Sequence, residues 1–396
     1  MRLLRLLLFD YRNFHRLEVT LAPGASLFVG DNAQGKTNLL EAVYLLATTK
    51  ELRAETEAQL IRRAALDDPI PAARVVGEAE SAEGAVKVEI AIVAREGSAG
   101  LLASKRVKVN GVPKRLSDAV GRLTAVLFTA ADIDLISGPP ASRRRYLDIT
   151  LSQVDRAYVS ARSRLERVIT QRNHLLKRIR EGAARADELA FWDDELARDG
   201  GYLFAVRSAA LAELAALAAG AHAELAPGEA LRLEYRPRLE SGAAALDGAE
   251  VAAGSYREAL TRGVRRDIAA GMTLQGPHRD DVAFLLDSEP AAGFASRAQQ
   301  RTIALALRLA EARLLHARRG EPPVLLLDDI LSEMDHGRAR SVIESVSSYD
   351  QLLVTATDLD RFPASFLDGA ALFTVEAGSV TAQFPAATST PGTAET

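Results

Sequence analysis

Gly30-Asp31-Asn32-Ala33-Gln34-Gly35-Lys36-Thr37 is the stretch that decides the fold, because it satisfies the phosphate-loop pattern G-x-x-x-x-G-K-[ST] in full. The apolar run Ser26–Val29 predicts a buried strand before it, and Thr37–Ala47 predicts a helix after it. Backbone N–H groups of such a loop surround a phosphate, and the helix N-terminus adds a positive dipole. Lys36 would reach the phosphate oxygens, and the Thr37 hydroxyl would hold Mg²⁺. A chance glycine-rich turn is the alternative, which the flanking strand and helix disfavour.

A second part of the same pattern lies far along the chain. Val324–Leu327 is a run of four apolar residues that ends in Asp328 and Asp329. A buried strand that delivers carboxylates at its end is the Walker B arrangement, in which Asp328 would order Mg²⁺ and Asp329 would act as general base. Acidic residues also simply end strands, but the phosphate loop favours the functional interpretation.

The segment Ser296-Arg297-Ala298-Gln299-Gln300-Arg301 opens the helix that precedes this acidic strand. ABC-class ATPases have their signature sequence at this position. There a serine and a helix N-terminus bind the γ-phosphate of nucleotide held by a partner subunit. Taken alone, Ser296 is a plain helix N-cap. The order of loop, signature and acidic strand favours a contact by Ser296, Ala298 and Gln299 with the partner's ATP.

The interval between the two parts has helical periodicity. Apolar residues recur at helical spacing from Leu165 to Ile179, and an Ala/Leu-rich helix is predicted over Tyr202–Leu225. Ser241–Ser255 has no periodicity and predicts a loose connection. We therefore predict an α/β fold, namely an ABC-type P-loop ATPase head (a mixed sheet flanked by helices) over 1–130 and 265–385. An α-helical arm over 131–264 interrupts it, and the tail 386–396 is predicted to be disordered.

Composition limits how the protein could meet a nucleic acid. The 396 residues include 49 Lys plus Arg and 53 Asp plus Glu, for a net charge of −4, so any DNA-binding surface must be local or assembled from two subunits.

The chain has no cysteine, which fits a reducing cytoplasm. The short apolar start is interrupted at Asp10 and predicts a strand rather than a signal peptide. No apolar stretch is expected to span a bilayer, which takes about 20 residues.

Several segments together resemble the RecF family. They are the opening strand and turn, the phosphate loop with its helix, two arm segments, the turn before the signature, the signature, and the acidic strand: Leu6–Phe14, Gly30–Tyr44, Arg143–Asp148, Gln171–Lys177, Gly276–Asp281, Ser296–Arg301 and Leu325–Asp335. The resemblance implies a DNA-binding ATPase of recombinational repair that uses ATP and Mg²⁺ and forms an ATP-dependent homodimer. It implies action at gapped single- and double-stranded DNA, with RecO and RecR, in loading RecA, in the SOS response and in replication recovery.

The resemblance also assigns residues, and three positions depart from the family or from the wider ABC class. It implies that Arg12 contacts nucleotide and that Arg53 lies where related heads touch DNA. Ala298 stands where the family's signature usually has glycine, which puts the tightness of the dimer in question. Asp329 replaces the glutamate of the wider ABC class, which is consistent with weak, slow hydrolysis. Thr357 lies where transporters place a histidine.

Basic residues of the arm are further candidates for DNA contacts. Arg143, Arg144, Arg145, Arg172 and Lys177 would form a basic face that neutralises phosphates. The alternative is a solvated helix surface paired with acidic neighbours.

His278, Asp280 and Asp281 present a similar choice. A metal site is conceivable there, but a buried ion-pair cluster under the signature helix is favoured, because one histidine and two carboxylates are sparse for a nuclease.

Three other kinds of protein share parts of the pattern. A transporter motor subunit would carry a Gly-Gly signature and a histidine after the last strand, and the chain has neither. A Rad50- or SMC-type tether needs hundreds of residues of heptad repeat. A nuclease of the overcoming-lysogenisation type needs a further metal-binding domain after Asp335.

Overall fold

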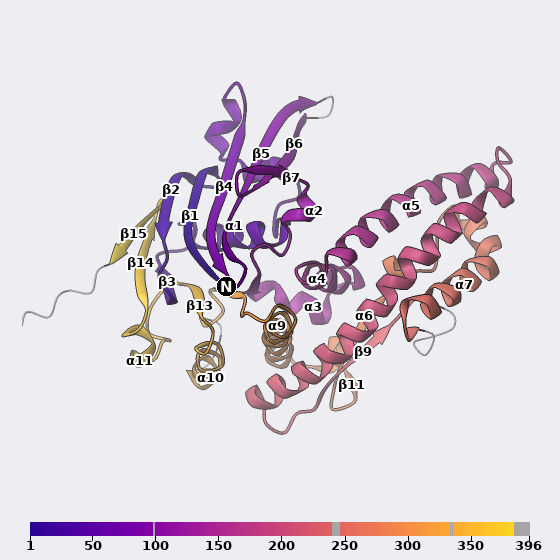
Figure 1. Ribbon diagram of the computed structural model, residues 1–396. Helices are drawn as coiled ribbons and strands as arrows, with labels where there is room; N and C mark the ends of the chain where they lie inside the picture. Colours follow the sequence, from indigo (N-terminus) through magenta and orange to yellow (C-terminus); the bar gives the residue numbers. More distant parts are fainter. Residues whose placement is uncertain (98–99, 240–245, 333, 335, 384–396) are drawn as a thin grey trace, which may run out of the picture.

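The computed structural model describes residues 1–97, 100–239, 246–332, 334 and 336–383. Figure 1 shows a head of sheets and helices from which a long helical arm projects. The predicted fold class, an α/β ABC-type head with an inserted helical arm, is confirmed by this arrangement.

The first sheet is antiparallel throughout, in the order β2-β1-β4-β5-β6-β7. Its strands are β1 (Arg2–Tyr11), β2 (Phe14–Thr20), β4 (Ala72–Ser81), β5 (Gly84–Gly97), β6 (Gly100–Val109) and β7 (Val112–Lys114). Asn110 and Gly111 have φ of 50° and 78°, which suits the two-residue hairpin turn that joins β6 to β7. Residues of alternating burial in β5 place one face of this sheet in the core.

The second sheet carries the phosphate loop and the acidic strand, in the order β15-β14-β3-β13-β12-β8. Its strands are β3 (Gly24–Val29), β8 (Ala125–Thr129), β12 (Val324–Asp328), β13 (Gln351–Ala356), β14 (Ala371–Glu376) and β15 (Ser379–Gln383). All neighbours are parallel except β14 and β15. The carboxyl ends of β3, β12 and β13 therefore meet at one edge, where open α/β sheets bind ligands.

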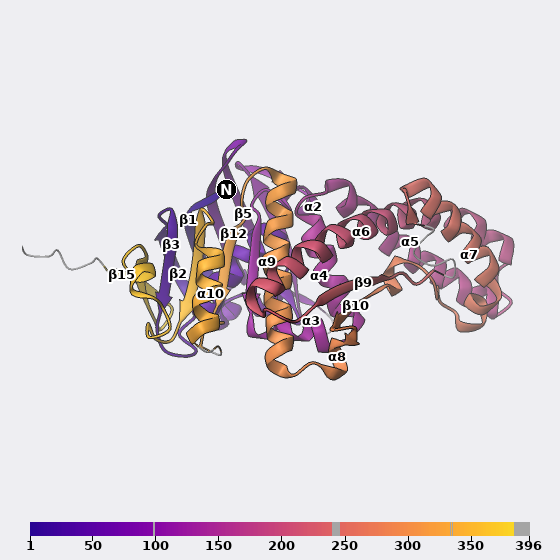
Figure 2. The ribbon, with the colours of Figure 1, turned by 90° about the horizontal axis from the view of Figure 1, so that it is seen from below.

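Helices cover both faces of the second sheet. α1 (Lys36–Thr48) is almost entirely buried between the two sheets, in a core that includes residues of β1, β4, β8 and β12. On the opposite face lie α9 (Arg297–Arg319) and α10 (His336–Val346), which Figure 2 shows beside each other in front of the strands. The phosphate-loop helix is thus held on two sides by apolar packing, which fixes its N-terminus.

Short elements complete the head and its junction with the arm. They are η1 (Glu57–Leu60), η2 (Arg63–Asp67), α2 (Leu116–Ala119), η3 (Ala130–Asp132), α3 (Ile133–Ser137), η4 (Ala186–Leu189), η6 (Pro277–Arg279), α8 (Ala291–Phe294) and α11 (Ala364–Leu367).

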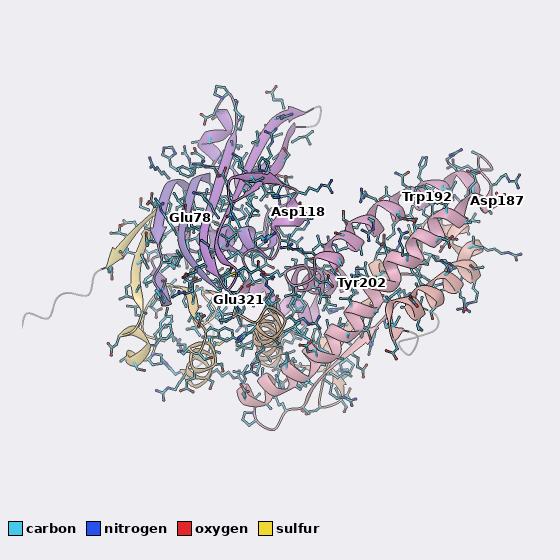
Figure 3. All side chains as sticks on the ribbon, in the orientation of Figure 1. Glu78, Asp118, Asp187, Trp192, Tyr202 and Glu321 are labelled. Atoms are coloured by element: carbon cyan, nitrogen blue, oxygen red, sulfur yellow. The ribbon has the colours of Figure 1, made fainter. Side chains whose placement is uncertain are left out.

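In the described part of the chain, four helices and a small sheet make the arm. The helices are α4 (Pro140–Ser152), α5 (Arg156–Arg180), α6 (Ala190–Leu225) and α7 (Ala249–Ala270), and the antiparallel sheet β11-β10-β9 uses β9 (Leu231–Arg236), β10 (Asp281–Leu286) and β11 (Glu289–Pro290). The 36 residues of α6 span about 54 Å at 1.5 Å per residue. Figure 3 places Asp187 and Trp192 at the far end of the arm.

Two expectations about the arm need correction. Residues 249–255, predicted as part of a loose connection, begin α7, because Ala252, Tyr256 and Ala259 bury a helical stripe against α6. The predicted boundary at 264 falls inside α7, so the helix continues across it. Residues 241–245 of the predicted connection and the tail 386–396 lie outside the described residues.

The expectation about membrane spans is also wrong for one segment. By length and composition alone, the helical segment 186–225 could cross a bilayer, since its most apolar window has a mean hydropathy of 1.5. In the structure α6 packs against α5, α7 and α9, and it buries the charged residues Asp199 and Arg207. The apolar composition of α6 is therefore explained by its place in the arm's core.

Candidate nucleotide-binding site

The phosphate loop connects the end of β3 to α1, and two of its glycines are required by their surroundings. A Cβ on Gly30 would lie 2.2 Å from the carbonyl oxygen of Val375. Gly35 has a φ of 115°, and a Cβ there would lie 2.4 Å from the side-chain amide of Asn13. The pattern that the sequence displays at these positions therefore has a steric cause.

Lys36 points back across the loop rather than into solvent. Its ammonium donates to the carbonyl oxygens of Gly30 at 2.5 Å and Asp31 at 2.9 Å, and the residue is only 6% exposed. Burial lowers the pKa of Lys36, while the carboxylates of Asp329, Asp328 and Asp31 oppose the shift. A partly desolvated ammonium beside a helix N-terminus attracts an anion strongly.

Thr37 and Asp328 meet although they are 291 positions apart. The Thr37 hydroxyl lies 2.8 Å from one carboxylate oxygen of Asp328 and 3.0 Å from the other, and Asp328 is 6% exposed. A hydroxyl and a carboxylate are oxygen ligands suited to Mg²⁺ in phosphate sites. The Asp328 carboxylate already forms an ion pair with a side chain, since the Arg53 guanidinium lies 3.1 Å from Asp328 Oδ2. The residues therefore fit a divalent cation.

Asp329 follows β12 in an unusual backbone conformation. Its φ of 52° is left-handed, which costs a non-glycine residue free energy. Two hydrogen bonds hold it there: its N–H donates to Thr355 Oγ1 at 3.0 Å, and Ser332 Oγ donates to its carbonyl oxygen at 2.8 Å. Thr355 Oγ1 also donates to Asp328 at 2.9 Å, so one threonine of β13 positions both aspartates.

Sequence reasoning missed the residues that hold the loop. The Asn13 side chain donates to the Gln34 carbonyl at 2.8 Å and accepts from Asn38 at 2.8 Å. On the other side, the Ala377 N–H donates to the Gln34 side chain at 2.7 Å. Asn13 stood in a segment noted only for its resemblance, and no local pattern marks Thr355 or Ala377.

Arg12 and Arg53 flank the first turns of α1. Arg12 donates to Glu41 at 3.0 Å, and Arg53 lies 3.7 Å from the other oxygen of the same carboxylate. Burial raises the pKa of Glu41, and both arginines oppose that shift. The contact of Arg12 with nucleotide stays a prediction. The structure places Arg53 at Asp328, the carboxylate predicted to hold Mg²⁺, which does not support the assignment of Arg53 to DNA.

Removing the Arg53 side chain is expected to raise the apparent affinity for Mg²⁺. Arg53 is half exposed, and a pair of this kind contributes roughly 1 kcal/mol at most, so Arg53→Ala should strengthen Mg²⁺ binding up to about fivefold. Titrating Mg²⁺ into protein with a fluorescent ATP analogue measures the change. Arg62→Ala is the matched control, because Arg62 pairs with Asp10 instead. A weaker Mg²⁺ affinity in Arg53→Ala would contradict competition at Asp328.

The signature residues lie at the start of α9. Ser296 is the N-cap: its hydroxyl accepts from the Gln299 N–H at 3.3 Å, and the Gln299 side chain accepts from the Ser296 N–H at 2.9 Å. Gln299 also donates to Glu229 at 3.0 Å. Ser296 and Ala298 are exposed, and among the described residues no hydrogen bond joins Ser296 to the phosphate loop. The structure thus leaves the signature available to another molecule.

The predicted basic face of the arm needs correction at two positions. Arg143 is 8% exposed and pairs with Asp281 at 2.6 Å, and Arg172 is fully buried between Asp193 and Asp267. Both guanidinium groups are neutralised inside the protein and cannot reach a DNA phosphate without breaking these pairs. Lys177 and Arg145 are exposed and Arg144 is half-buried, so these three stay candidates.

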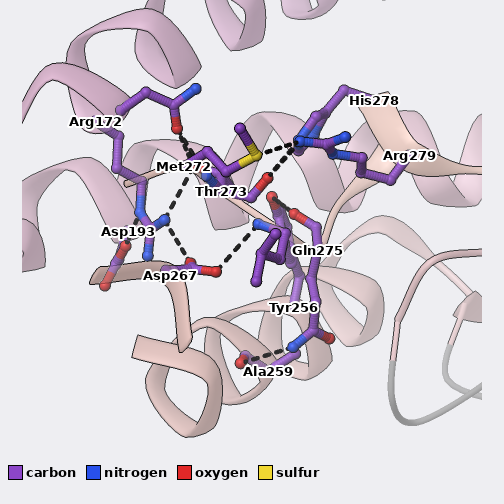
Figure 4. A network of polar contacts seen from close by, with 12 residues as sticks. Arg172, Asp193, Tyr256, Ala259, Asp267, Met272, Thr273, Gln275, His278 and Arg279 are labelled. Atoms are coloured by element: carbon purple, nitrogen blue, oxygen red, sulfur yellow. Dashed lines mark hydrogen bonds and ion pairs between the residues drawn. The ribbon is translucent and has the colours of Figure 1, made fainter. Parts of the chain in front are cut away.

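Arg172→Met is expected to destabilise the arm rather than change DNA binding by folded protein. Figure 4 shows the Arg172 guanidinium donating to Asp193, Asp267 and Thr273, at 2.7, 2.6 and 2.9 Å. The variant leaves two carboxylates unpaired, which costs about 3–5 kcal/mol of unfolding free energy. Urea unfolding measures the loss. Lys177→Met, on the exposed face of α5, should change stability by less than about 0.5 kcal/mol. Equal stability of the two variants would refute this.

Of the residues His278, Asp280 and Asp281, the two aspartates form the favoured ion pairs, whereas His278 contacts the carbonyl oxygen of Thr273 at 3.2 Å. Asp280 pairs with Arg207 at 3.0 Å and Asp281 with Arg143 at 2.6 Å, so the cluster joins β10 to α6 and α4. Burial lowers the pKa of His278 to about 4, which keeps it neutral. No group of three or more potential metal ligands is found within the part of the chain that the structure describes.

The sheet order, the buried loop lysine and the threonine–aspartate contact define an ABC-type P-loop ATPase head. Comparison with known proteins narrows the class. Residues 2–368 match the family described as RecF/RecN/SMC N terminal domain. The DNA replication and repair protein RecF of Chloroflexus aurantiacus is 42% identical over 388 residues, with 95% of this chain and 98% of the relative covered. That of Herpetosiphon aurantiacus is 43% identical over 394 residues, covering 96% and 99%. The chain belongs to the RecF family.

Solved structures agree with this assignment. The recombination mediator protein RecF bound to ATP, described in the RecFOR pathway, superposes with a TM-score of 0.85 at 29% identity, covering 96% of this chain and 97% of the other. An SMC head superposes with a TM-score of 0.52 at 15% identity, a likeness of fold alone. ATP is thus the nucleotide that a solved relative holds on this fold.

Proposed function

We propose that the protein is an ATP-dependent DNA-binding recombination mediator of gap repair. It would dimerise on single-/double-stranded DNA junctions and, with RecO and RecR, help to load RecA in the cytoplasm, supporting the SOS response and replication recovery. The observation that supports this most is the contact of Thr37 with Asp328. It joins the loop to the acidic strand, although the whole arm lies between them in the sequence. A transporter motor is disfavoured by family membership and by Thr357 after β13.

The head's own residues supply the steps of a weak, DNA-stimulated ATPase. Loop N–H groups from Gly30 to Thr37 bind and orient the phosphates, and Lys36 matches their charge. Thr37 and Asp328 would hold Mg²⁺, which neutralises developing phosphate charge when bound. Asp329 orients the attacking water and accepts its proton. The aspartate side chain is one methylene shorter than glutamate, which favours slow hydrolysis that acts as a timer.

Ser296 would complete the site of a second copy. Its exposed hydroxyl and the N-terminus of α9, a helix of 23 residues, suit a γ-phosphate presented from outside the chain. Ala298 adds a β-carbon where glycine is usual, so we expect a weak dimer. We also take the head as 1–130 plus the residues after β11, with the arm between them. The end of the arm therefore moves from 264 to Pro290.

Ser296→Arg is the experiment that tests this dimer. An arginine at an exposed interface position should abolish ATP-dependent dimerisation, while nucleotide binding stays near the parent value because the phosphate loop is intact. Sedimentation with Mg-ATP, beside a nucleotide titration, measures both. Ser348→Arg, at an exposed serine after α10, is the matched control. An undiminished ATP-dependent dimer in Ser296→Arg would reject the sandwich arrangement.

A further inference from the structure

A cavity of about 330 Å³ opens where the head meets the arm. Its walls come from the chain just after α1, from α4, α5 and α6, and from the turn that follows α7: Lys50, Glu51, Ala141, Arg144, Arg145, Asp148, Ile149, Arg162, Arg207 and His278. Five of these side chains are cationic and two are carboxylates, so the lining has an excess of positive charge.

Two of the five cations are already neutralised. Arg207 lies 2.7 Å from Asp148 and Arg162 lies 3.5 Å from the same carboxylate. The other carboxylate of the lining, Glu51, is taken by Lys105 at 2.6 Å, which approaches from outside the cavity. The acidic residues of the cavity therefore have no free charge to offer the remaining cations.

Among the described residues, the other three cations of the lining form no ion pair with a carboxylate. Arg144 donates to the carbonyl oxygen of Asp280 at 2.7 Å, and Arg145 donates to the carbonyl oxygen of Glu51. Within the described part of the chain, the Lys50 ammonium forms no hydrogen bond or ion pair. Backbone carbonyls orient the two guanidinium groups without cancelling their charge, so three positive charges converge on one cavity.

We propose that Lys50, Arg144 and Arg145 form a pocket that binds phosphodiester groups of the DNA backbone at the head–arm junction. This inference rests on the proposed DNA-binding function, and it narrows the DNA surface to three named residues. Arg143 and Arg172 are excluded, because their own ion pairs neutralise them. Lys50 comes from the head, so the bound backbone would contact both parts of the protein.

Repulsion between like charges supports the assignment of this pocket to phosphate. Burial lowers the pKa of Lys50, and the neighbouring cations Arg162 and Lys105 lower it further, while the carboxylates of Glu51 and Glu166 oppose the shift. Burial and the Arg207 cation also lower the pKa of Arg144. A bound phosphate would relieve both effects, because it places negative charge among groups that now repel one another.

Free nucleotide is the other source of phosphate, and the geometry disfavours it. The pocket lies beyond the C-terminal end of α1, whereas the phosphate loop lies at its N-terminal end. The 13 residues of α1 separate the two by about 20 Å. A nucleotide held at Lys36 therefore cannot place its phosphates in this pocket.

The test is a salt titration of binding to gapped duplex DNA with Mg-ATP present. The slope of log K against log salt is negative, and each phosphate contact contributes about 0.9 to its magnitude. The variant Lys50→Gln/Arg144→Gln/Arg145→Gln should therefore reduce that magnitude by about two to three units. The loss of DNA affinity should be the same for every DNA sequence, and ATP affinity should stay at the parent value. Because Arg144 also holds the Asp280 carbonyl, Lys50→Gln/Arg145→Gln serves as a second variant, with an expected fall of about two units.

The matched control removes the same charge from elsewhere on the arm. Arg185, Arg198 and Arg257 are exposed, and each pairs with a carboxylate, so their triple replacement by glutamine should leave the slope near the parent value. An unchanged slope in both pocket variants, an equal fall in the control, or a loss of ATP affinity would overturn the pocket. If the parent protein itself fails to bind DNA, the proposed function falls instead.

Discussion

Lys36→Ala is expected to lower ATP affinity about 100-fold or more. The Lys36 ammonium is buried and is held at the loop by two of its carbonyls, so its removal leaves the charge of the phosphates unmatched. Truncating one partner of a desolvated charge pair costs about 2–5 kcal/mol, and each 1.4 kcal/mol is a factor of ten. Equilibrium binding of a fluorescent ATP analogue measures the loss.

Lys50→Ala is the matched control for this change, because it removes a lysine at the other end of the same helix. ATP affinity of that variant should equal the parent value. Thermal unfolding of both variants without nucleotide separates a binding defect from a folding defect. If Lys36→Ala bound ATP as tightly as the parent, the loop would not be the nucleotide site.

Asp329→Asn should retain ATP and lose hydrolysis. Asparagine tolerates the left-handed conformation that Asp329 adopts, so the backbone bonds to Thr355 and Ser332 should persist. Only the proposed general base is removed, and such groups contribute about 10²–10⁴-fold to rate. Phosphate release should therefore fall at least about 100-fold while nucleotide affinity is unchanged, and the ATP-bound dimer should accumulate on DNA.

Asp358→Asn, at an exposed carboxylate just after β13, is the control for charge loss near this edge of the sheet. Its hydrolysis rate should match the parent. A parent-like rate in Asp329→Asn would show that another group activates the water.

Local patterns in the sequence predicted the centre of the head well. The strand Gly24–Val29, the loop and α1 follow from one motif. Other strands were missed for a physical reason. The strand β4 contains Ala, Gly and Glu, which have low β-propensity, and its position between β1 and β5 stabilises it instead.

The site shows the same division between local and long-range information. Lys36 and Thr37 are recognisable because their neighbours in sequence are also their neighbours in space. Asn13 and Thr355 reach the site only through sheet pairing and packing, so no spacing rule identifies them. Likewise, Arg172 looks like a surface cation on α5 until its partners on α6 and α7 are known.

The central claim is that ATP joins two copies of this chain around DNA, and sedimentation tests it most directly. The parent protein should sediment as a monomer without nucleotide. With Mg-ATP and gapped duplex, it should sediment as a complex that contains two copies per DNA, and Lys36→Ala should not form that complex. A single copy per DNA with Mg-ATP present, or a dimer that is indifferent to ATP, would contradict the account.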